Sequence, residues 1–537
     1  MKHHVRITVM YTILVLMMLF LIFRLYAVTE SGIAAQVLSG QYTRKLNAVG
    51  RRGFIFDRNG ETLNAQRDGY ICIVNPAACN NEKITAGMLA DYTETPESEI
   101  RRKMTEKAPF TLKLRTKVFG DGLGCFPLYR MKTLCAPHTV GYTDVSGNGV
   151  TGIEKYFNTV LSSTFSGKVN VRYMADANGG KLDGSGVCIY DDGYTDNSGI
   201  YLTLDKDLQL YCEELVRKYP DLSGAICVTD IKNGEILACV SFPGFDTEKT
   251  AELLESTKGE LVNRCTAGFT PGSIFKTVVA AAALELDPML AHYEYECNGS
   301  ITTKEGTAVS CHKKDGHGTL DMSNAYAQSC NAYFINLAHM TGEDMITETA
   351  RRMGVSESFT LDGVFLCTSD VPDSSESPST LSGYLANTAI GQGRILMSVP
   401  AACRMFACAV TGYDVPLHIL YGIYDGNSFI RRYNGKNAKT RVLSHKTCVK
   451  LKEMMCLCTS EGLGREAASP DGLACGKTAT AQSGSCSDGK EILNCWFCGV
   501  YPSDNPEYAV SVLFCDTKNG NKAKITFREI CEYLKRR

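Results

Sequence analysis

The chain has 537 residues, a formal net charge of −2 and 44% hydrophobic residues. A chain of this length usually forms two or three domains, and this apolar content can build a sizeable core. The charge is almost balanced and no long run carries one sign, which argues against a nucleic-acid-binding protein with its basic field.

The N-terminal segment differs from the rest. Lys2 and Arg6 precede an uncharged apolar run from Ile7 to Phe23, which Arg24 closes. Three interpretations compete: a core helix, a cleaved signal peptide and an uncleaved anchor. A core helix would be amphipathic, and a signal peptide has a shorter apolar region with a small-residue cleavage site. We predict a transmembrane anchor with the N-terminus inside and the bulk of the chain outside, because the basic residues precede the span.

The region after this segment contains short strand-like pieces and ends in a Gly/Asp-rich stretch at 179–199. Such composition is typical of loops and hairpin turns. We therefore predict a tail and anchor at 1–28, an N-terminal domain at 29–200 and a C-terminal domain at 201–537.

The C-terminal region opens with a helical pattern that Asp205 can cap. Residues 224–242 then predict two strands around the Asn-Gly turn at 233–234. Helical segments fill the middle, strand patterns return near the end, and a last helix is expected at 527–537. A sheet whose strands come from both ends of this domain, with helices packed around it, fits this order.

One short stretch carries candidate chemistry. Ser273 follows a Pro-Gly pair, and Lys276 comes one helical turn later, before an apolar run. Residues i and i+3 share a helix face, so the amine can reach the hydroxyl. A deprotonated amine can take the proton of a serine and make it a nucleophile. The alternative is a helix-capping serine with a solvated lysine, because Ser-x-x-Lys is common by itself.

Two further motifs strengthen the catalytic interpretation. Ser-Cys-Asn supplies Ser329 and Asn331, and Lys-Thr-Ala-Thr supplies Lys477, Thr478 and Thr480. Together with Ser-Ile-Phe-Lys, these motifs occur in the chain order of the Ser-x-x-Lys, Ser-Asp-Asn and Lys-Thr-Gly set of penicillin-binding proteins and class A β-lactamases.

The chain thus resembles the class B penicillin-binding proteins, the monofunctional peptidoglycan D,D-transpeptidases. The stretch 51–64 (RRGFIFDRNGETLN) looks like the family's box just outside the membrane, and the boxes at 137–158, 202–209 and 316–320 match as well. The resemblance implies an α+β fold, a transpeptidase domain with an antiparallel sheet flanked by helices. A membrane span and an elongated pedestal domain would precede it.

The resemblance also implies roles. Ser273 would attack a D-Ala-D-Ala bond and form an acyl-enzyme, and Lys276 would be its general base. Ser329, helped by Lys477, would relay a proton to the leaving D-alanine.

Binding roles follow in the same way. Asn331 would hold the substrate amide, and Thr478 and Thr480 would bind the terminal carboxylate. The backbone N–H groups of Ser273 and Thr480 would form the oxyanion hole. An amine of a neighbouring stem peptide would accept the acyl group, and β-lactams would trap Ser273.

One position departs from the family pattern, because Ala479 stands where the family has glycine. A methyl group there could crowd the acyl pocket. This leaves two rivals: a D,D-carboxypeptidase or β-lactamase on the same fold, and a weakly active penicillin-binding scaffold or sensor in a division or sporulation complex.

Among the 24 cysteines, Cys297 and Cys311 bracket a hairpin and could equally be bridged or free. Cys495 and Cys498 are interpreted as strand residues rather than metal ligands, since residues three apart on a strand face opposite sides. His138 is expected to be structural. His312 and His317 hint at a metal, but we interpret their loop as positioning the helix of Ser329, and no metal is expected.

The resemblance implies no cofactor. The expected partners are peptidoglycan stem peptides, β-lactams and a multispanning membrane glycan polymerase, and the pedestal could mediate a homodimer. The sequence does not decide between division, elongation and sporulation.

Overall fold

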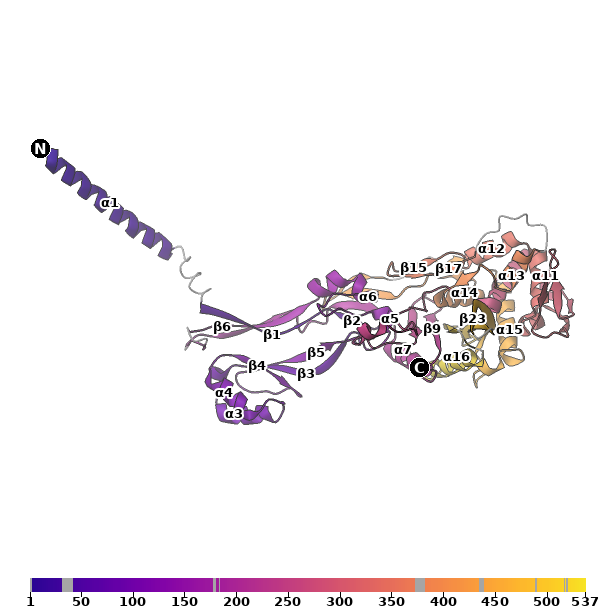
Figure 1. The fold of residues 1–537 in the computed structure, drawn as a ribbon, viewed down its shortest axis with the longest axis horizontal. Coiled ribbons are helices and arrows are strands. Elements are labelled where there is room, and N and C mark those ends of the chain that lie inside the picture. The colour runs from indigo at the N-terminus through magenta and orange to yellow at the C-terminus, as the bar shows by residue number, and fades with distance from the viewer. Residues whose placement is uncertain are drawn as a thin grey trace. The chain divides into compact units, whose positions relative to one another are not determined.

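The computed structural model describes residues 2–30, 42–176, 180–182, 184–371, 382–433, 439–487, 490–515, 517 and 520–537 (Figure 1). The chain forms two compact units. The first contains Met1–Arg52, Gln66–Arg130 and Ser166–Asp196, and the second contains Gly53–Ala65, Met131–Phe165 and Asn197–Arg537. Each unit is therefore assembled from segments that are distant in the sequence.

The N-terminal helix α1 runs over Lys2–Glu30. Its segment His4–Ala27 has a mean hydropathy of 2.4, and no part of its most apolar window is buried inside the protein. The helix is thus long and apolar enough to cross a membrane, which is compatible with the expected single-pass anchor.

The first unit contains two three-stranded sheets. In one sheet, β1 (Thr43–Arg51), β6 (Gly167–Met174) and β7 (Val187–Asp192) pair in that order; in the other the order is β4 (Phe110–Leu114), β3 (Ala65–Val74) and β5 (Leu123–Met131). Helices α3 (Glu82–Ala90) and α4 (Glu97–Thr105) share a core with the second sheet, formed by Cys72, Leu89 and Ile100 among others. Apolar residues on one face of each element thus build this unit.

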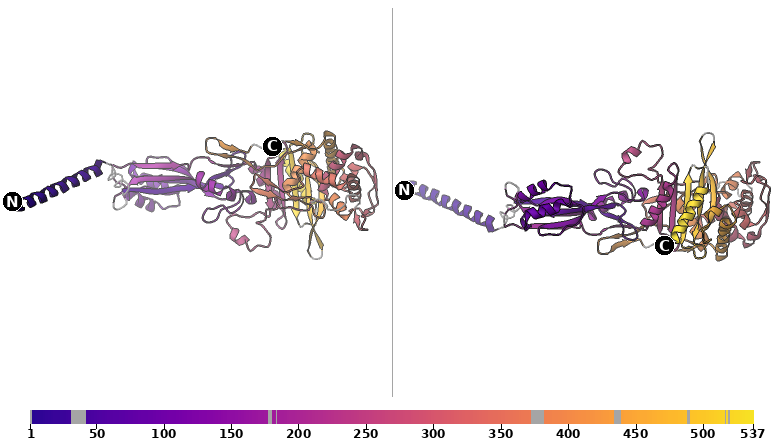
Figure 2. Two further views of the ribbon diagram at one scale, coloured as in Figure 1. Left: turned by 90° about the horizontal axis from the view of Figure 1, so that it is seen from above. Right: turned by 90° about the horizontal axis from the view of Figure 1, so that it is seen from below.

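The second unit is organised around a five-stranded antiparallel sheet in the order β10-β9-β25-β24-β23. These strands are β9 (Ser223–Asp230), β10 (Ile236–Phe242), β23 (Cys475–Ser487), β24 (Lys490–Tyr501) and β25 (Tyr508–Cys515). The first two strands and the last three come from opposite ends of the segment, as predicted. Figure 2 shows the late strands beside the early ones.

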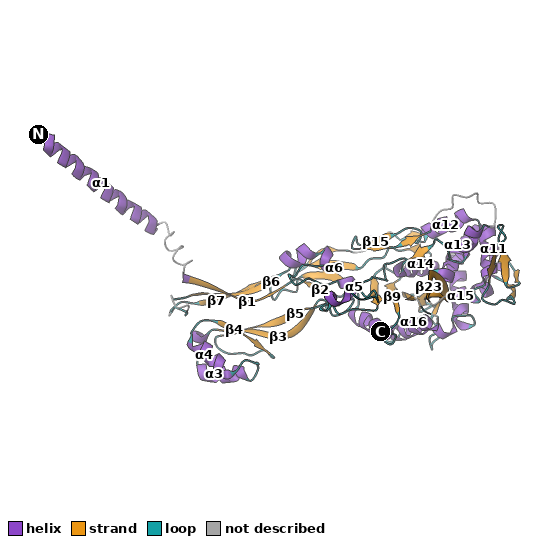
Figure 3. Ribbon diagram, in the orientation of Figure 1, coloured by secondary structure: helices purple, strands orange, loops and turns teal. Residues whose placement is uncertain are grey.

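Helices cover both faces of this sheet (Figure 3). On one face, α7 (Lys206–Arg217) and α16 (Asn521–Leu534) pack on residues such as Val228 and Phe514. On the other face, α9 (Lys276–Leu286) and α14 (Val399–Thr411) pack on alternate strand residues such as Cys227 and Leu513. The period of two along each strand produces this division. Asp205 caps α7 by accepting from the Leu208 N–H at 3.1 Å, as expected.

A four-stranded sheet, with order β2-β8-β20-β21, also belongs to the second unit. Its strands are β2 (Phe54–Phe56), β8 (Gly199–Leu202), β20 (Leu420–Tyr424) and β21 (Phe429–Arg432). Next to β2, Asn64 accepts from the Ile55 N–H at 2.8 Å and donates to Glu154 Oε1 at 2.7 Å. Asn64 and Glu154 come from two of the family boxes, so a buried hydrogen bond joins these boxes.

The remaining elements surround the central sheet. They are α5 (Pro137–Val140), α6 (Gly152–Tyr156), α8 (Thr250–Leu253), β11 (Tyr295–Cys297), β12 (Ser300–Thr302), β13 (Ala308–Ser310), β14 (Gly318–Leu320), α10 (Met322–Ala327), α11 (Asn331–Thr341), α12 (Glu343–Arg352), β15 (Phe359–Leu361), β16 (Phe365–Cys367), β17 (Ser369–Asp370), α13 (Gly383–Ala389), β18 (Leu396–Met397), β19 (Tyr413–Asp414), β22 (Thr440–Arg441) and α15 (His445–Ser460).

Candidate active site

Ser273 lies in a single 3-10 turn, η3 (Gly272–Phe275), which leads directly into α9. Its side chain is partly exposed, whereas the next two residues are buried. Gly272 has φ +57°, and its N–H donates to the Gly391 carbonyl at 2.8 Å. The turn before α9 therefore leaves Ser273 partly exposed while the helix that follows is buried. Ser273 lies at the start of a helix, as the sequence predicts.

Lys276 is fully buried at the first position of α9. Its Nζ donates to the Ser329 carbonyl at 2.8 Å, to Ser329 Oγ at 3.3 Å and to Asn331 Oδ1 at 2.7 Å. Burial, and then the charge of Lys477, hold the pKa of Lys276 well below its ordinary value. Burial therefore favours the neutral amine, which is the form that can accept a proton.

Ser329 and Asn331 belong to the turn between α10 and α11. Ser329 has φ +53°, is 9% exposed and donates its N–H to the Tyr326 carbonyl at 3.1 Å. A serine in this left-handed region is strained, and such strain is common where a side chain must point into a site. Asn331 begins α11, and its Nδ2 donates to the Ser310 carbonyl at 3.0 Å.

Lys477 lies on β23 and is also fully buried. Its Nζ donates to the Thr478 carbonyl at 3.1 Å and to Thr478 Oγ1 at 3.3 Å, and it lies 5.5 Å from the ring centroid of Tyr326. Burial lowers its pKa. Tyr326 thus contacts both the Ser-Cys-Asn motif and the Lys-Thr-Ala-Thr motif. The sequence motifs alone did not predict this contact.

The methyl group of Ala479 faces the nucleophile turn. Ala479 is 4% exposed, whereas its neighbour Thr480 is exposed and Thr478 is half-buried. A Cβ built on Gly272 would lie 3.4 Å from the Ala479 Cβ and 3.0 Å from the Ala481 Cβ. Gly272 therefore leaves the space that the two alanine methyls fill beneath the nucleophile turn.

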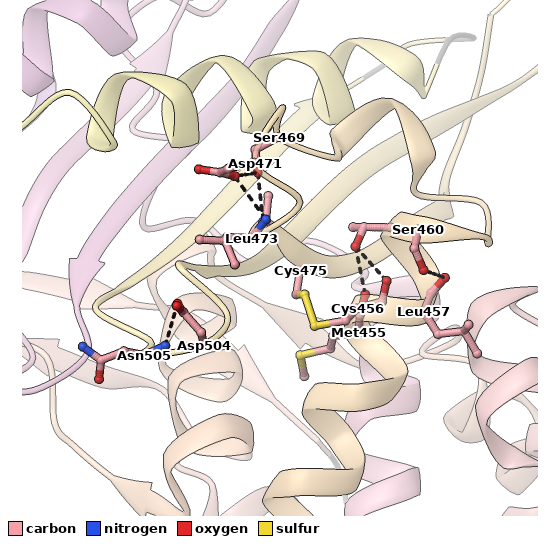
Figure 4. Close-up of a disulfide and its surroundings, with 12 residues drawn as sticks. Met455, Cys456, Leu457, Ser460, Ser469, Asp471, Leu473, Cys475, Asp504 and Asn505 are labelled. Carbon is pink, nitrogen blue, oxygen red and sulfur yellow. Dashed lines mark hydrogen bonds between the residues drawn. A yellow bond between two sulfur atoms is a disulfide. The ribbon is translucent and has the colours of Figure 1, made fainter.

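A disulfide that sequence analysis did not predict lies beside this strand. It joins Cys456 on α15 to Cys475, the first residue of β23 and two residues before Lys477 (Figure 4). By contrast, Cys297 and Cys311 are both free, with their sulfurs 3.7 Å apart, so the disulfide left open for this pair is absent. Cys495 and Cys498 lie on β24, as predicted.

The histidines occupy two different settings. His138 is buried in α5, where its Nε2 lies 2.6 Å from the Glu260 carbonyl, and burial lowers its pKa to about 4. His317 directly precedes β14, with Nδ1 3.4 Å from the Cys297 sulfur. His312 lies beside it, with the two rings tilted and their centroids 5.0 Å apart.

Lys276 thus joins the nucleophile turn to the Ser-Cys-Asn motif, and β23 packs against the same turn. Comparison with known proteins identifies the family. The penicillin binding protein transpeptidase domain matches residues 224–532, more than half of the chain. The chain belongs to this family. Among curated relatives, Stage V sporulation protein D of Bacillus subtilis is 25% identical, over 88% of this chain and 75% of the relative.

Other relatives support the class B assignment within the penicillin-binding protein family. Peptidoglycan D,D-transpeptidase MrdA of Acinetobacter baumannii is 25% identical over 90% of this chain and 80% of its own length. A solved structure of a peptidoglycan synthase complex, described as coordinating polymerization and crosslinking, has a TM-score of 0.67 at 21% identity and covers 98% of this chain and 97% of that chain. The resemblance and the fold inferred from the sequence are confirmed, and the protein is a transpeptidase of the class B type.

Proposed function

We propose that this protein cross-links peptidoglycan stem peptides through an acyl-enzyme on Ser273. The observation that carries the proposal is the pair of buried lysines: Lys276 contacts the motif of Ser329, and Lys477 lies on the strand that packs against the nucleophile turn. A structural role alone does not require two buried amines in one site, because burying each of them carries a large desolvation cost.

In the first half of the reaction, Ser273 Oγ attacks the carbonyl carbon between the two terminal D-alanines while neutral Lys276 accepts its proton. The N–H groups of Ser273 and Thr480 stabilise the tetrahedral oxyanion, where losing one donor typically costs about 10²–10³ in rate. The C–N bond then breaks as the proton held on Lys276 passes through Ser329 to the nitrogen, helped by Lys477, so that D-alanine leaves and Lys276 is neutral again.

In the second half, the amine of a neighbouring stem peptide attacks the acyl-ester. Its nitrogen loses a proton to Lys276, the C–O bond breaks, and Lys276 returns the proton to Ser273 Oγ, which restores the free serine. Asn331 holds the amide of the donor peptide, and Thr478 and Thr480 bind its terminal carboxylate. A β-lactam would enter as a mimic of the donor, and its acyl group would remain on Ser273.

The relatives favour transfer over hydrolysis. The relative from Acinetobacter baumannii is named a peptidoglycan D,D-transpeptidase and matches 90% of this chain. This supports the transpeptidase over its hydrolytic rivals.

We extend the proposal to the setting of the enzyme. Residues 1–28 would form the tail and anchor, 29–200 a pedestal that could pair two copies, and 201–537 the extracytoplasmic transpeptidase domain. A multispanning glycan polymerase would be its membrane partner, supported by the likeness to a complex in which polymerization and crosslinking are coordinated.

The test is acylation of the full-length protein in detergent by a fluorescent penicillin, with the adduct mapped by mass spectrometry. We expect a covalent mass on the peptide that carries Ser273 and no adduct in Ser273→Ala. A folded protein that gives no adduct would overturn the proposal and favour the scaffold or sensor.

A further inference from the structure

A cluster of three cysteines and one histidine lies behind the Ser-Cys-Asn motif. Its members are Cys297, Cys311, His317 and Cys330, whose candidate ligand atoms all lie within 4.8 Å of one another. Each comes from a different place in the fold: the end of β11, the residue after β13, the residue before β14 and the N-cap of α11. The fold therefore gathers four soft ligands over a span of 34 positions.

The spacing of these atoms fits a tetrahedral metal site. The Cys297 and Cys311 sulfurs are 3.7 Å apart, the Cys311 and Cys330 sulfurs 3.8 Å, and His317 Nδ1 is 3.4 Å from the Cys297 sulfur. Ligands around zinc, with Zn–S of about 2.3 Å and Zn–N of about 2.0–2.1 Å, are separated by about 3.8 Å for two sulfurs and about 3.5 Å for sulfur and nitrogen.

Backbone N–H groups point at two of the sulfurs. The Ala332 N–H donates to the Cys311 sulfur and the Tyr333 N–H to the Cys330 sulfur, each at 3.4 Å. Both donors belong to the first turn of α11, where the free N–H groups and the helix dipole stabilise negative charge. His317 Nε2 is buried without a hydrogen-bond partner in the described chain, so the polar contact of this ring is at Nδ1, toward the sulfurs.

The local fold also needs a crosslink. Between α9 and α10 the chain forms two separate two-stranded sheets, β11 with β14 and β12 with β13. Sheets of two short strands are marginal in water unless other contacts hold them. Ligands from both sides of these hairpins would be held together by one ion.

We propose that Cys297, Cys311, Cys330 and His317 bind one Zn²⁺ in a Cys₃His site. A disulfide between Cys297 and Cys311 would use two of the four groups and leave Cys330 and His317 unexplained, whereas one ion uses all four. Such closed four-ligand sites are structural rather than catalytic. The site lies outside the transpeptidase reaction, and it contradicts the expectation from sequence that no metal is bound.

The ion would position two residues of the active site. Cys330 lies between Ser329 and Asn331, and both neighbours contact Lys276 Nζ. Asn331 also donates to the carbonyl of Ser310, the residue before Cys311. Fixing Cys330 and Cys311 on one ion therefore fixes the turn that presents Ser329 and Asn331 to the lysine.

The first experiment measures zinc in the full-length protein, purified in detergent and supplied with Zn²⁺ alone, by elemental analysis. We expect about one zinc per chain. We expect less than about a tenth of this in Cys297→Ser and His317→Ala, and no change in Cys188→Ser, whose cysteine is exposed and outside the cluster. Equal zinc in the wild type and in Cys297→Ser, or no zinc in a folded wild type, would overturn the proposal.

The second experiment uses the wild type and does not depend on a variant that folds. Reactive thiols are counted before and after a strong chelator in denaturing buffer without reductant. Chelation should release three thiols under conditions where a disulfide stays closed. The disulfide Cys456–Cys475 accounts for two of the thiols that a reductant releases. If the chelator releases none and the reductant releases four, the pair Cys297–Cys311 is also a disulfide and the zinc site is refuted.

The positioning role has its own readout. Removing zinc should slow acylation by a fluorescent penicillin at least about tenfold, and adding Zn²⁺ back should restore it. Cys297→His, which keeps a nitrogen ligand, should retain zinc and acylation, whereas Cys297→Ser should lose both. If zinc is lost and the acylation rate does not change, the zinc site stands but its role in positioning Ser329 is refuted.

Discussion

At the scale of single residues, the site depends on two buried amines whose pKa values are lowered. Lys276 and Lys477 are both fully buried. Lys276 contacts the Ser-Cys-Asn motif through Asn331, and Lys477 contacts Thr478 within its own strand. Desolvation lowers the pKa of each lysine, and the charge of Lys477 lowers that of Lys276 further. Lys477 therefore lowers the pKa of the proposed base, in addition to its proposed part in the proton relay.

This coupling predicts a pH shift. A general base acts only when it is neutral, so the acylation rate should rise as the pH passes upward through the pKa of Lys276. Lys477→Met removes a positive charge that lowers this pKa, so the midpoint of the residual rate should move to higher pH. The measurement is the second-order rate of penicillin acylation against pH.

The control for this shift is Lys446→Met, because Lys446 is an exposed lysine on α15. Its profile should match the wild type. Lys276→Ala should reduce acylation by about 10²–10⁴-fold at every pH. A Lys477→Met midpoint that stays in place or moves to lower pH would contradict the coupling.

Ala479 gives a second prediction at this scale. Its methyl packs against Gly272 under the nucleophile turn and away from the threonine face of β23. Ala479→Gly should lower the free energy of unfolding by about 1–2 kcal/mol, from the lost methyl burial and the added chain entropy. Acylation should stay within a few-fold of the wild type.

Ala481→Gly is the matched control for Ala479→Gly, because its methyl faces Gly272 in the same way. Chemical denaturation and acylation rates would be compared for both. If Ala479→Gly accelerated acylation tenfold while Ala481→Gly did not, the methyl would be an obstacle in the acyl pocket, as the sequence first suggested.

At the scale of elements, the disulfide Cys456–Cys475 ties α15 to the beginning of β23. It closes a loop with a sequence separation of 19 residues. A crosslink over about this length stabilises a fold by about 3 kcal/mol in the chain-entropy account. Cys456→Ser should therefore lower thermal stability by this order, and a reductant should lower the wild type to the same level.

Two controls define this effect. Reductant should have no further effect on Cys456→Ser, and Cys448→Ser, which alters a buried free cysteine on the same helix, should still respond to it. Equal reductant sensitivity in Cys456→Ser and the wild type would show that another bond is responsible.

The elements also show what sequence can reveal. The helix capped by Asp205, the strands β9 and β10 and the helix start at Ser273 depend on contacts within a few residues, so local patterns predict them. The Cys456–Cys475 disulfide and the Cys297–Cys330 cluster join separate elements, and spacing along the chain carries no such information. The same is true of Tyr326, whose ring and carbonyl connect two motifs.

At the scale of the whole molecule, chain order and spatial order differ. The motifs of Ser273, Ser329 and Lys477 span about two hundred residues, yet β23 adds to the sheet beside β24 and returns Lys477 to the nucleophile turn. The order of the motifs indicated the family. Composition did not indicate that residues 53–65 and 131–165 belong to the second unit, which is built from separate segments of the chain. A sequence divided at single positions gives continuous domains, whereas each of these units combines several separate segments of the chain.

The final prediction concerns the topology of α1. Lys2 and Arg6 precede the apolar span, so the N-terminus should remain inside and the rest of the chain outside. Cys188 is exposed in the first unit, which makes it a reporter of that unit's side of the membrane. In spheroplasts, a membrane-impermeant maleimide should label Cys188, and Cys188→Ser should lose that labelling.

A cysteine introduced before the span by Val5→Cys should be labelled only after permeabilisation. The intact mass distinguishes an anchor from a signal peptide, because a cleaved chain would lack Val5 altogether and Val5→Cys would never be labelled. Labelling of Val5→Cys in sealed spheroplasts would reverse the topology, and the proposed extracytoplasmic reaction would then have no access to its substrate.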